Sequence, residues 1–211
     1  MLAQPMLEPT CGQGVCRGNG IRAISIRASM MSDDPYNVLF LSNRNVTRSI
    51  LGEAVTNRLG QKRFRGFSAG INPAEKIDPL VFDVLKAAEY RTDGLRPKHW
   101  EEFANADAPP LDFVFTLCDP MAGEPLPHWP GRPITADWRY PDPENIHGEE
   151  WQQRKALAQI LAGLERQFRA FMNLPFKSLD EISLRARLGK LGQTKSYRRS
   201  SRHADSTSAS P

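Results

Sequence analysis

The chain of 211 residues has only three cysteines and no long apolar run. Three cysteines cannot form the disulfide framework of a small secreted domain, so a reducing cytoplasm is the predicted compartment. No apolar segment approaches the roughly 18 residues that a membrane-spanning helix needs. The first 30 residues also lack the apolar core of a secretory signal. These absences argue against secreted and membrane-spanning classes, and no membrane partner is expected.

Little of the positive charge belongs to the central part of the chain. The formal net charge is +4, of which residues 1–30 contribute +2 and residues 191–211 contribute +3. The charge that remains for residues 31–190 is −1. Basic charge that is confined to the chain ends says little about the ligand of a folded domain. No nucleic-acid partner is therefore expected.

Four parts of the chain are predicted from composition and periodicity. Residues 1–34 are expected to be a disordered leader, and a start of translation assigned too far upstream is the alternative interpretation. Residues 35–176 form the folded domain, and residues 177–190 form an appended helix. Residues 191–211 are rich in serine and arginine and are expected to be a disordered basic tail.

The most informative stretch is a short strand followed by a polar loop and a helix. Residues 38–41 are four apolar residues in a row, which is typical of a strand buried on both faces of a parallel sheet. The loop that follows would direct several backbone N–H groups and the positive end of a helix dipole at one point. Arg48 adds a planar fork of donors that suits a tetrahedral oxyanion. The predicted binding residues for phosphate or a phosphate mimic are Asn43, Arg44, Asn45, Val46, Thr47, Arg48 and Ser49.

Strands and helices alternate along the rest of the domain. Further strands are expected at residues 63–67, 113–117 and 132–136, and helices at 79–88, 99–103 and 149–172. Asp78 is expected to cap a helix, because Pro79 follows it at the first helical position. This alternation predicts an α/β domain with a parallel sheet and right-handed crossovers.

These motifs resemble the low-molecular-weight phosphotyrosine phosphatases and the related thioredoxin-coupled arsenate reductases. The arsenate-reductase-like branch is the most similar, because it typically reads V-L-F-L-C-T-G-N-S-A-R-S and the chain matches it at residues 38–41, Asn45, Arg48 and Ser49. The resemblance implies a three-layer sandwich with a four-stranded parallel sheet in the order 2-1-3-4. It also implies phosphate, arsenate, or a phosphorylated small molecule or protein as partner, with no metal and no other cofactor.

The chain departs from the family at the nucleophile. Ser42 stands where the family has a cysteine whose thiolate attacks phosphorus or arsenic. A serine hydroxyl would need an adjacent base for the same attack, and none lies near it in the sequence. Asp142, between two prolines, matches the position of the family's general acid, although a helix-entry turn is the alternative interpretation. A protein that binds an oxyanion without turnover is therefore the leading hypothesis.

Residues 117–131 resemble the arsenate reductases more than the tyrosine phosphatases. In the reductases, three cysteines pass oxidation from the nucleophile to a surface disulfide. Cys118 matches the middle relay position, whereas Leu126 stands at the last one. One thiol cannot close an intramolecular disulfide, so thioredoxin is a doubtful partner and Cys118 is expected to be a buried structural thiol. His99 and His128 are expected at the surface without a metal.

Other interpretations of the same residues remain open. A plain strand-to-helix turn would use Ser42 and Asn45 as caps and place Arg48 in a surface ion pair. A live enzyme could use Ser42 or Cys118 as its nucleophile. An interaction module could contact an acidic partner through its basic tail. Finally, Arg44 replaces a glycine of the family, and a positive φ there would cost about 1 kcal/mol.

Overall fold

The computed structural model describes residues 34–105, 107–117, 129–143 and 149–193, so the predicted leader and most of the tail lie outside it. The elements in chain order are β1 (Tyr36–Ser42), α2 (Arg48–Leu59), β2 (Phe64–Gly70), α3 (Pro79–Ala87), η1 (Trp100–Phe103), β3 (Phe113–Thr116), β4 (Ile134–Asp137), α4 (Glu150–Met172), η3 (Phe176–Ser178) and α5 (Glu181–Gln193). All strand pairs are parallel, and the strand order β2-β1-β3-β4 confirms the predicted topology.

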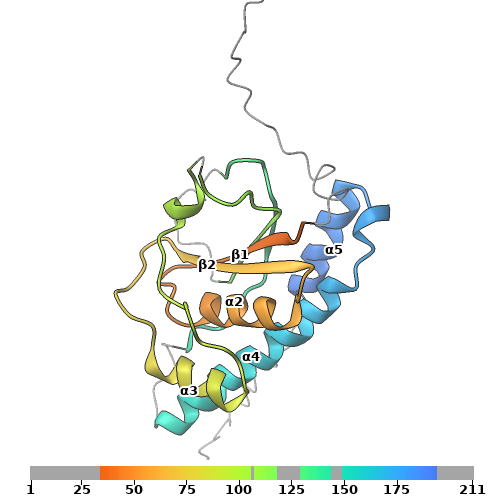
Figure 1. Cartoon of the computed structure of the whole chain (residues 1–211). Helices are drawn as coiled ribbons and strands as arrows, with labels where there is room; N and C mark the ends of the chain where they lie inside the picture. Colours follow the sequence, from red (N-terminus) through yellow and green to blue (C-terminus); the bar gives the residue numbers. More distant parts are fainter. Residues whose placement is uncertain (1–33, 106, 118–128, 144–148, 194–211) are drawn as a thin grey trace, which may run out of the picture.

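The sheet lies between two layers of unequal thickness. Figure 1 shows α2, α3 and α4 together on one face of the sheet. On the other face, η1 and neighbouring loops cover the strands, with Phe103 and Trp129 packed against Leu39 and Leu41 of β1. This arrangement confirms the predicted three-layer sandwich.

Alternation along β1 explains why both faces are apolar. Val38 and Phe40 face the helical layer, whereas Leu39 and Leu41 face the other layer. The helical side holds the larger core, in which the Trp138 ring stacks on the Phe115 ring with centroids 3.8 Å apart. Each such fully buried large side chain stabilises the fold by about 1.5–3 kcal/mol.

Two helix starts show how the sequence directs the chain locally. Asp78 caps α3, since its Oδ1 accepts a hydrogen bond from the Leu80 N–H at 2.9 Å, and Pro79 occupies the first turn as predicted. Helix α4 begins after Glu149, which forms a capping box with Gln152. Both helices therefore begin at the end of the sheet where β1 and β2 end.

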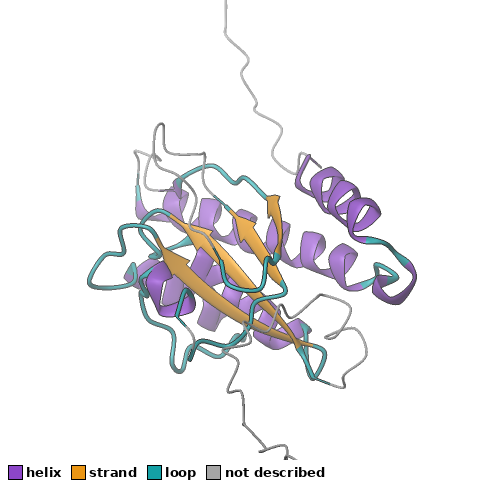
Figure 2. Cartoon of the chain, turned by 90° about the horizontal axis from the view of Figure 1, so that it is seen from above, coloured by secondary structure: helices purple, strands orange, loops and turns teal. Residues whose placement is uncertain are grey.

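The appended helix α5 differs from its predicted bounds. It begins at Glu181 rather than at residue 177, and it continues to Gln193, so residues 191–193 are helical and not part of a disordered tail. Leu184 and Leu188 are fully buried in the core, and the Leu191 carbonyl accepts a hydrogen bond from Gln167 at 2.8 Å, which supports the last turn. Figure 2 shows this helix beside the sheet, where it contacts the edge strand β4. In the described parts of the chain, no helix is long and apolar enough to cross a membrane.

Candidate oxyanion site

The loop between β1 and α2 is held from behind through its carbonyl groups. Three consecutive carbonyls accept hydrogen bonds from the segment after β2: Ser42 from Ile71 at 3.1 Å, Asn43 from Asn72 at 2.9 Å, and Arg44 from Ala74 at 3.0 Å. The close approach needs a glycine at the end of β2, because a Cβ at Gly70 would lie 2.7 Å from the Asn43 carbonyl oxygen. This contact explains the glycine at position 70.

Asn45, and not Arg44, has the left-handed backbone conformation in this loop. Its φ is 52°, a region that asparagine tolerates better than most residues. The strain expected at Arg44 is therefore absent. The Asn45 side chain holds the loop in place, since its Oδ1 accepts from the Lys98 N–H at 2.7 Å and its Nδ2 donates to Ser49 Oγ at 2.8 Å.

Ser42 lies at the bottom of the loop among neutral groups. Its side chain is buried, and its Oγ lies 2.7 Å from Ser49 Oγ. The same oxygen accepts a hydrogen bond from the Asn45 N–H at 3.2 Å. Among the residues that the structure describes, no histidine, lysine or carboxylate forms a hydrogen bond with this hydroxyl. Ser42 therefore has partners that fix its position but none there that would remove its proton.

Arg48 is buried and directs its guanidinium to the segment before α4. Its Nη1 donates to the Tyr140 carbonyl at 3.0 Å, and its Nη2 lies 2.7 Å from Asp142 Oδ2. The Nε atom is buried and has no hydrogen-bond partner among the residues that the structure describes. Only 7% of Arg48 is exposed, so the alternative of a surface ion pair is wrong.

Asp142 is bonded to Arg48 of the loop. Its side chain is 32% exposed and forms the ion pair with Arg48. Glu149, and not Asp142, caps α4, but the backbone at Pro143, directly after Asp142, is 3-10 helical, which agrees with the helix-entry interpretation. The structure thus brings Asp142 to the loop that holds Ser42 and Arg48, although it lies 94 residues after Arg48 in the sequence.

The first turn of α2 adds unused backbone donors. Thr47 is the N-cap, and its side chain makes no capping hydrogen bond, so Ser42 and Asn45 are not the caps. The first bond of the helix runs from the Leu51 N–H to the Thr47 carbonyl at 3.0 Å. Within the described part of the chain, the N–H groups of residues 48–50 therefore have no acceptor. Such donors, together with the helix dipole, favour an anion.

Sequence reasoning missed a buried ion pair that lies behind the loop. Lys98 Nζ is 2.9 Å from Glu53 Oε2, and the Ser68 hydroxyl donates to the same carboxylate oxygen. All three residues are buried. Lys98 also bonds Asn45 through its main chain, so the pair connects α2 and β2 with the loop. No sequence pattern pointed to Glu53 or Lys98.

Of the other candidates, Cys118, Leu126, His128 and His99, the structure describes only His99. Cys118, Leu126 and His128 lie outside the described residues, as do the other two cysteines. His99 caps η1 and pairs with Glu101 at the surface. Among the residues described, no group of three histidine, cysteine or acidic side chains could hold a metal ion.

Comparison with known proteins gives one family match and several structural neighbours. The family model described as low molecular weight phosphotyrosine protein phosphatase matches residues 37–183. An arsenate reductase described in its phosphate binding state is 22% identical with a TM-score of 0.53, covering 65% of this chain and 96% of its own. The arsenate reductase of Archaeoglobus fulgidus DSM 4304 is 26% identical with a TM-score of 0.48, covering 61% and 96%.

A tyrosine phosphatase is also among the neighbours. Wzb from Escherichia coli K30, in complex with sulphate, is 18% identical with a TM-score of 0.49, covering 65% of this chain and 98% of its own. No curated protein matches the chain. The family match spans well over half of the sequence and agrees with the observed sheet order, and it confirms the resemblance drawn from the motifs. The chain belongs to the low molecular weight phosphotyrosine protein phosphatase family.

Proposed function

We propose that this chain binds a tetrahedral oxyanion, phosphate or arsenate, in the loop of residues 42–49 and does not turn it over. The observation that carries the proposal is the buried Nε of Arg48, for which the described residues supply no hydrogen-bond partner. A buried donor left without an acceptor costs about 1–3 kcal/mol, and an oxyanion oxygen would remove that cost.

The donors of the loop fit such an anion in number and kind. The N–H groups of residues 48–50 lack acceptors among the described residues, and they lie at the positive end of α2. Arg48 supplies a planar fork that matches tetrahedral oxygens, and hydrogen bonds of this kind to a charged acceptor are stronger than neutral ones. Asp142 opposes binding, because its carboxylate already accepts from Arg48 Nη2.

The absence of turnover is proposed from the surroundings of Ser42. A serine hydroxyl must give its proton to a base as it attacks. The described partners of Ser42 are the Ser49 hydroxyl and a backbone N–H, and neither is a base. Asp142 stands where it could protonate a leaving group, but a general acid without an activated nucleophile does not complete the reaction.

The proposal is tested with the full-length chain and its Ser42→Cys variant. Calorimetric titration with phosphate and arsenate should give saturable binding to the wild-type protein. The wild type should show no hydrolysis of p-nitrophenyl phosphate, whereas Ser42→Cys should gain it, because a cysteine thiol ionises far more readily than a serine hydroxyl. Hydrolysis by the wild type that disappears in a Ser42→Ala variant would overturn the claim of inactivity, and absence of anion binding would overturn the claim of binding.

A further inference from the structure

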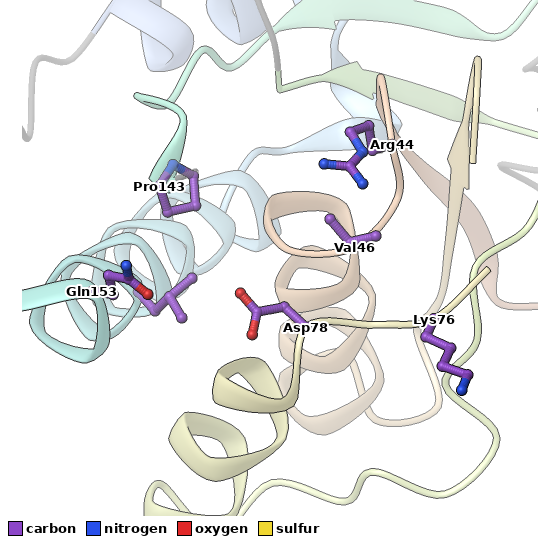
Figure 3. A pocket seen from close by; sticks show the side chains of 7 residues that line it. Arg44, Val46, Lys76, Asp78, Pro143 and Gln153 are labelled. Carbon is purple, nitrogen blue, oxygen red and sulfur yellow. The ribbon is translucent and has the colours of Figure 1, made fainter. Parts of the chain in front are cut away.

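A cavity of about 370 Å³ opens beside the oxyanion loop (Figure 3). Its walls come from the loop, from the N-terminal end of α3, from the segment before α4, and from α4 itself. The lining residues used below are Arg44, Val46, Asp78, Pro143, Gln153 and Leu157. Its volume is near the lower end of the range of about 300–1,000 Å³ for small-molecule sites.

The cavity and the oxyanion site share a border. Val46 lines the cavity and lies two residues before Arg48, which supplies the buried donor. Pro143 lines the cavity on the other side and directly follows Asp142, which is bonded to Arg48. A ligand that places its phosphoryl group in the loop can therefore extend its remaining atoms into the cavity.

Groups of opposite charge face the cavity from different walls. Figure 3 shows the Arg44 side chain extending from the loop over the cavity, and the Asp78 carboxylate directed into it from the start of α3. Asp78 Oδ1 accepts from the Leu80 N–H, whereas Oδ2 bonds none of the described residues. Lys76 also lines the cavity, but its ammonium group points away from the other side chains.

The rest of the lining is apolar apart from one amide. Val46 and Leu157 are 6% and 1% exposed, and Pro143 is also buried. The side-chain amide of Gln153 is directed toward Asp78 in Figure 3, and it makes no hydrogen bond within the described part of the chain. A few polar groups on an apolar surface are typical of a site that fixes the orientation of a small ligand.

We infer that this cavity binds the body of a small zwitterionic phosphomonoester, of the class of phosphorylated amino acids. The ammonium group of the ligand would bind Asp78, with Gln153 as an additional acceptor, and the carboxylate would bind Arg44. The apolar surface of Val46 and Leu157 would contact the carbon atoms between them. This inference rests on the proposed oxyanion site, because the phosphoryl group occupies the loop.

The test is calorimetric titration of the full-length chain with four probes: inorganic phosphate, O-phosphoethanolamine, 2-phosphoglycolate and O-phospho-L-serine. O-Phospho-L-serine should bind about tenfold more tightly than phosphate. O-Phosphoethanolamine, which adds only an ammonium group to the phosphate, and 2-phosphoglycolate, which adds only a carboxylate, should bind with intermediate affinity. Asp78→Asn keeps the cap of α3, since asparagine caps equally well, but removes the charge. In Asp78→Asn, the affinity gained from the ligand's ammonium group should be lost. In Arg44→Gln, the affinity gained from the ligand's carboxylate should be lost.

The outcomes distinguish a failure of the cavity inference from a failure of the oxyanion proposal on which it rests. Equal affinity for phosphate and O-phospho-L-serine, or a preference that survives Asp78→Asn, would overturn the cavity inference while phosphate binding upheld the oxyanion site. Failure of all four probes to bind would instead overturn the oxyanion proposal itself. A thermal melt of each variant, unchanged from the wild type, shows that any lost preference comes from the cavity.

Discussion

The two ends of the loop differ in charge and in unused hydrogen-bonding capacity. At the first end, the Ser42 hydroxyl is buried and bonded to two neutral groups, the Ser49 hydroxyl and the Asn45 N–H. At the other end, Arg48 is an equally buried cation with one donor unused, beside backbone N–H groups for which the described residues supply no acceptor. Under the proposed function, the described residues at the first end supply no base for a nucleophile, whereas those at the second end offer donors to an anion.

Under the proposed function, this difference means that reactivity and binding depend on separate residues of one short loop. Between the ends, Asn45 bonds Ser49 on one side and the Lys98 main chain on the other. The carbonyls of the loop are bonded to the segment after β2 in a way that does not involve the Ser42 side chain. A change of nucleophile can thus leave the shape of the loop intact.

The largest effect is expected from the buried ion pair of Lys98 and Glu53, which lies behind the loop. Lys98→Met would leave the Glu53 carboxylate buried without its cation, which should lower the free energy of unfolding by about 3–5 kcal/mol. Urea denaturation followed by circular dichroism measures the change. The matched control is Lys98→Met with Glu53→Gln, which should recover most of the loss because the amide keeps a hydrogen bond with Ser68. A Lys98→Met variant as stable as the wild type would mean that the pair does not support the loop.

A smaller effect, confined to the second end, is expected from Asp142→Asn. The variant removes the carboxylate that competes with an anion for Arg48, so phosphate affinity should rise by about tenfold. The gain in phosphate affinity is limited because Asp142 is partly exposed to solvent, which weakens its attraction to Arg48. Calorimetric titration with phosphate checks it. Weaker binding in this variant would instead show that Asp142 assists the anion.

The smallest effect is expected at the first end. Ser42→Ala removes the hydrogen bonds with Ser49 and the Asn45 N–H, which should cost about 1 kcal/mol of stability. Phosphate affinity should stay within about threefold of the wild type, because only neutral hydrogen bonds are lost and Arg48 keeps its charge and its donors. Complete loss of phosphate binding in Ser42→Ala would show that the two ends are not separable.

The sequence was sufficient to predict those elements whose pattern lies within a few neighbouring residues. The apolar run before Ser42 and the helical spacing after it predicted β1 and α2, and Asp78 followed by Pro79 predicted the start of α3. The strand order came from the family resemblance, since periodicity alone does not distinguish neighbouring strands. The motifs also named Arg48 and Asp142 as site residues, although they did not predict that these two side chains bond each other.

The features that sequence reasoning missed depend on tertiary contacts. Glu53 and Lys98 are an ordinary helix residue and an ordinary loop residue until the fold buries them together. The identity of the left-handed residue depended on how the loop meets β2, and this placed Asn45 rather than Arg44 at positive φ. Likewise, α5 extends past its expected end because Gln167 bonds the Leu191 carbonyl.

The most direct test of the account is a phosphate titration of the wild type beside an Arg48→Ala variant, both shown to be folded by circular dichroism. The account predicts saturable binding to the wild type and an affinity at least about 100-fold lower in the variant, since two or more hydrogen bonds between charged groups are lost. Failure of the wild type to bind phosphate, or equal binding by both proteins, would contradict the claim that this loop is an oxyanion site.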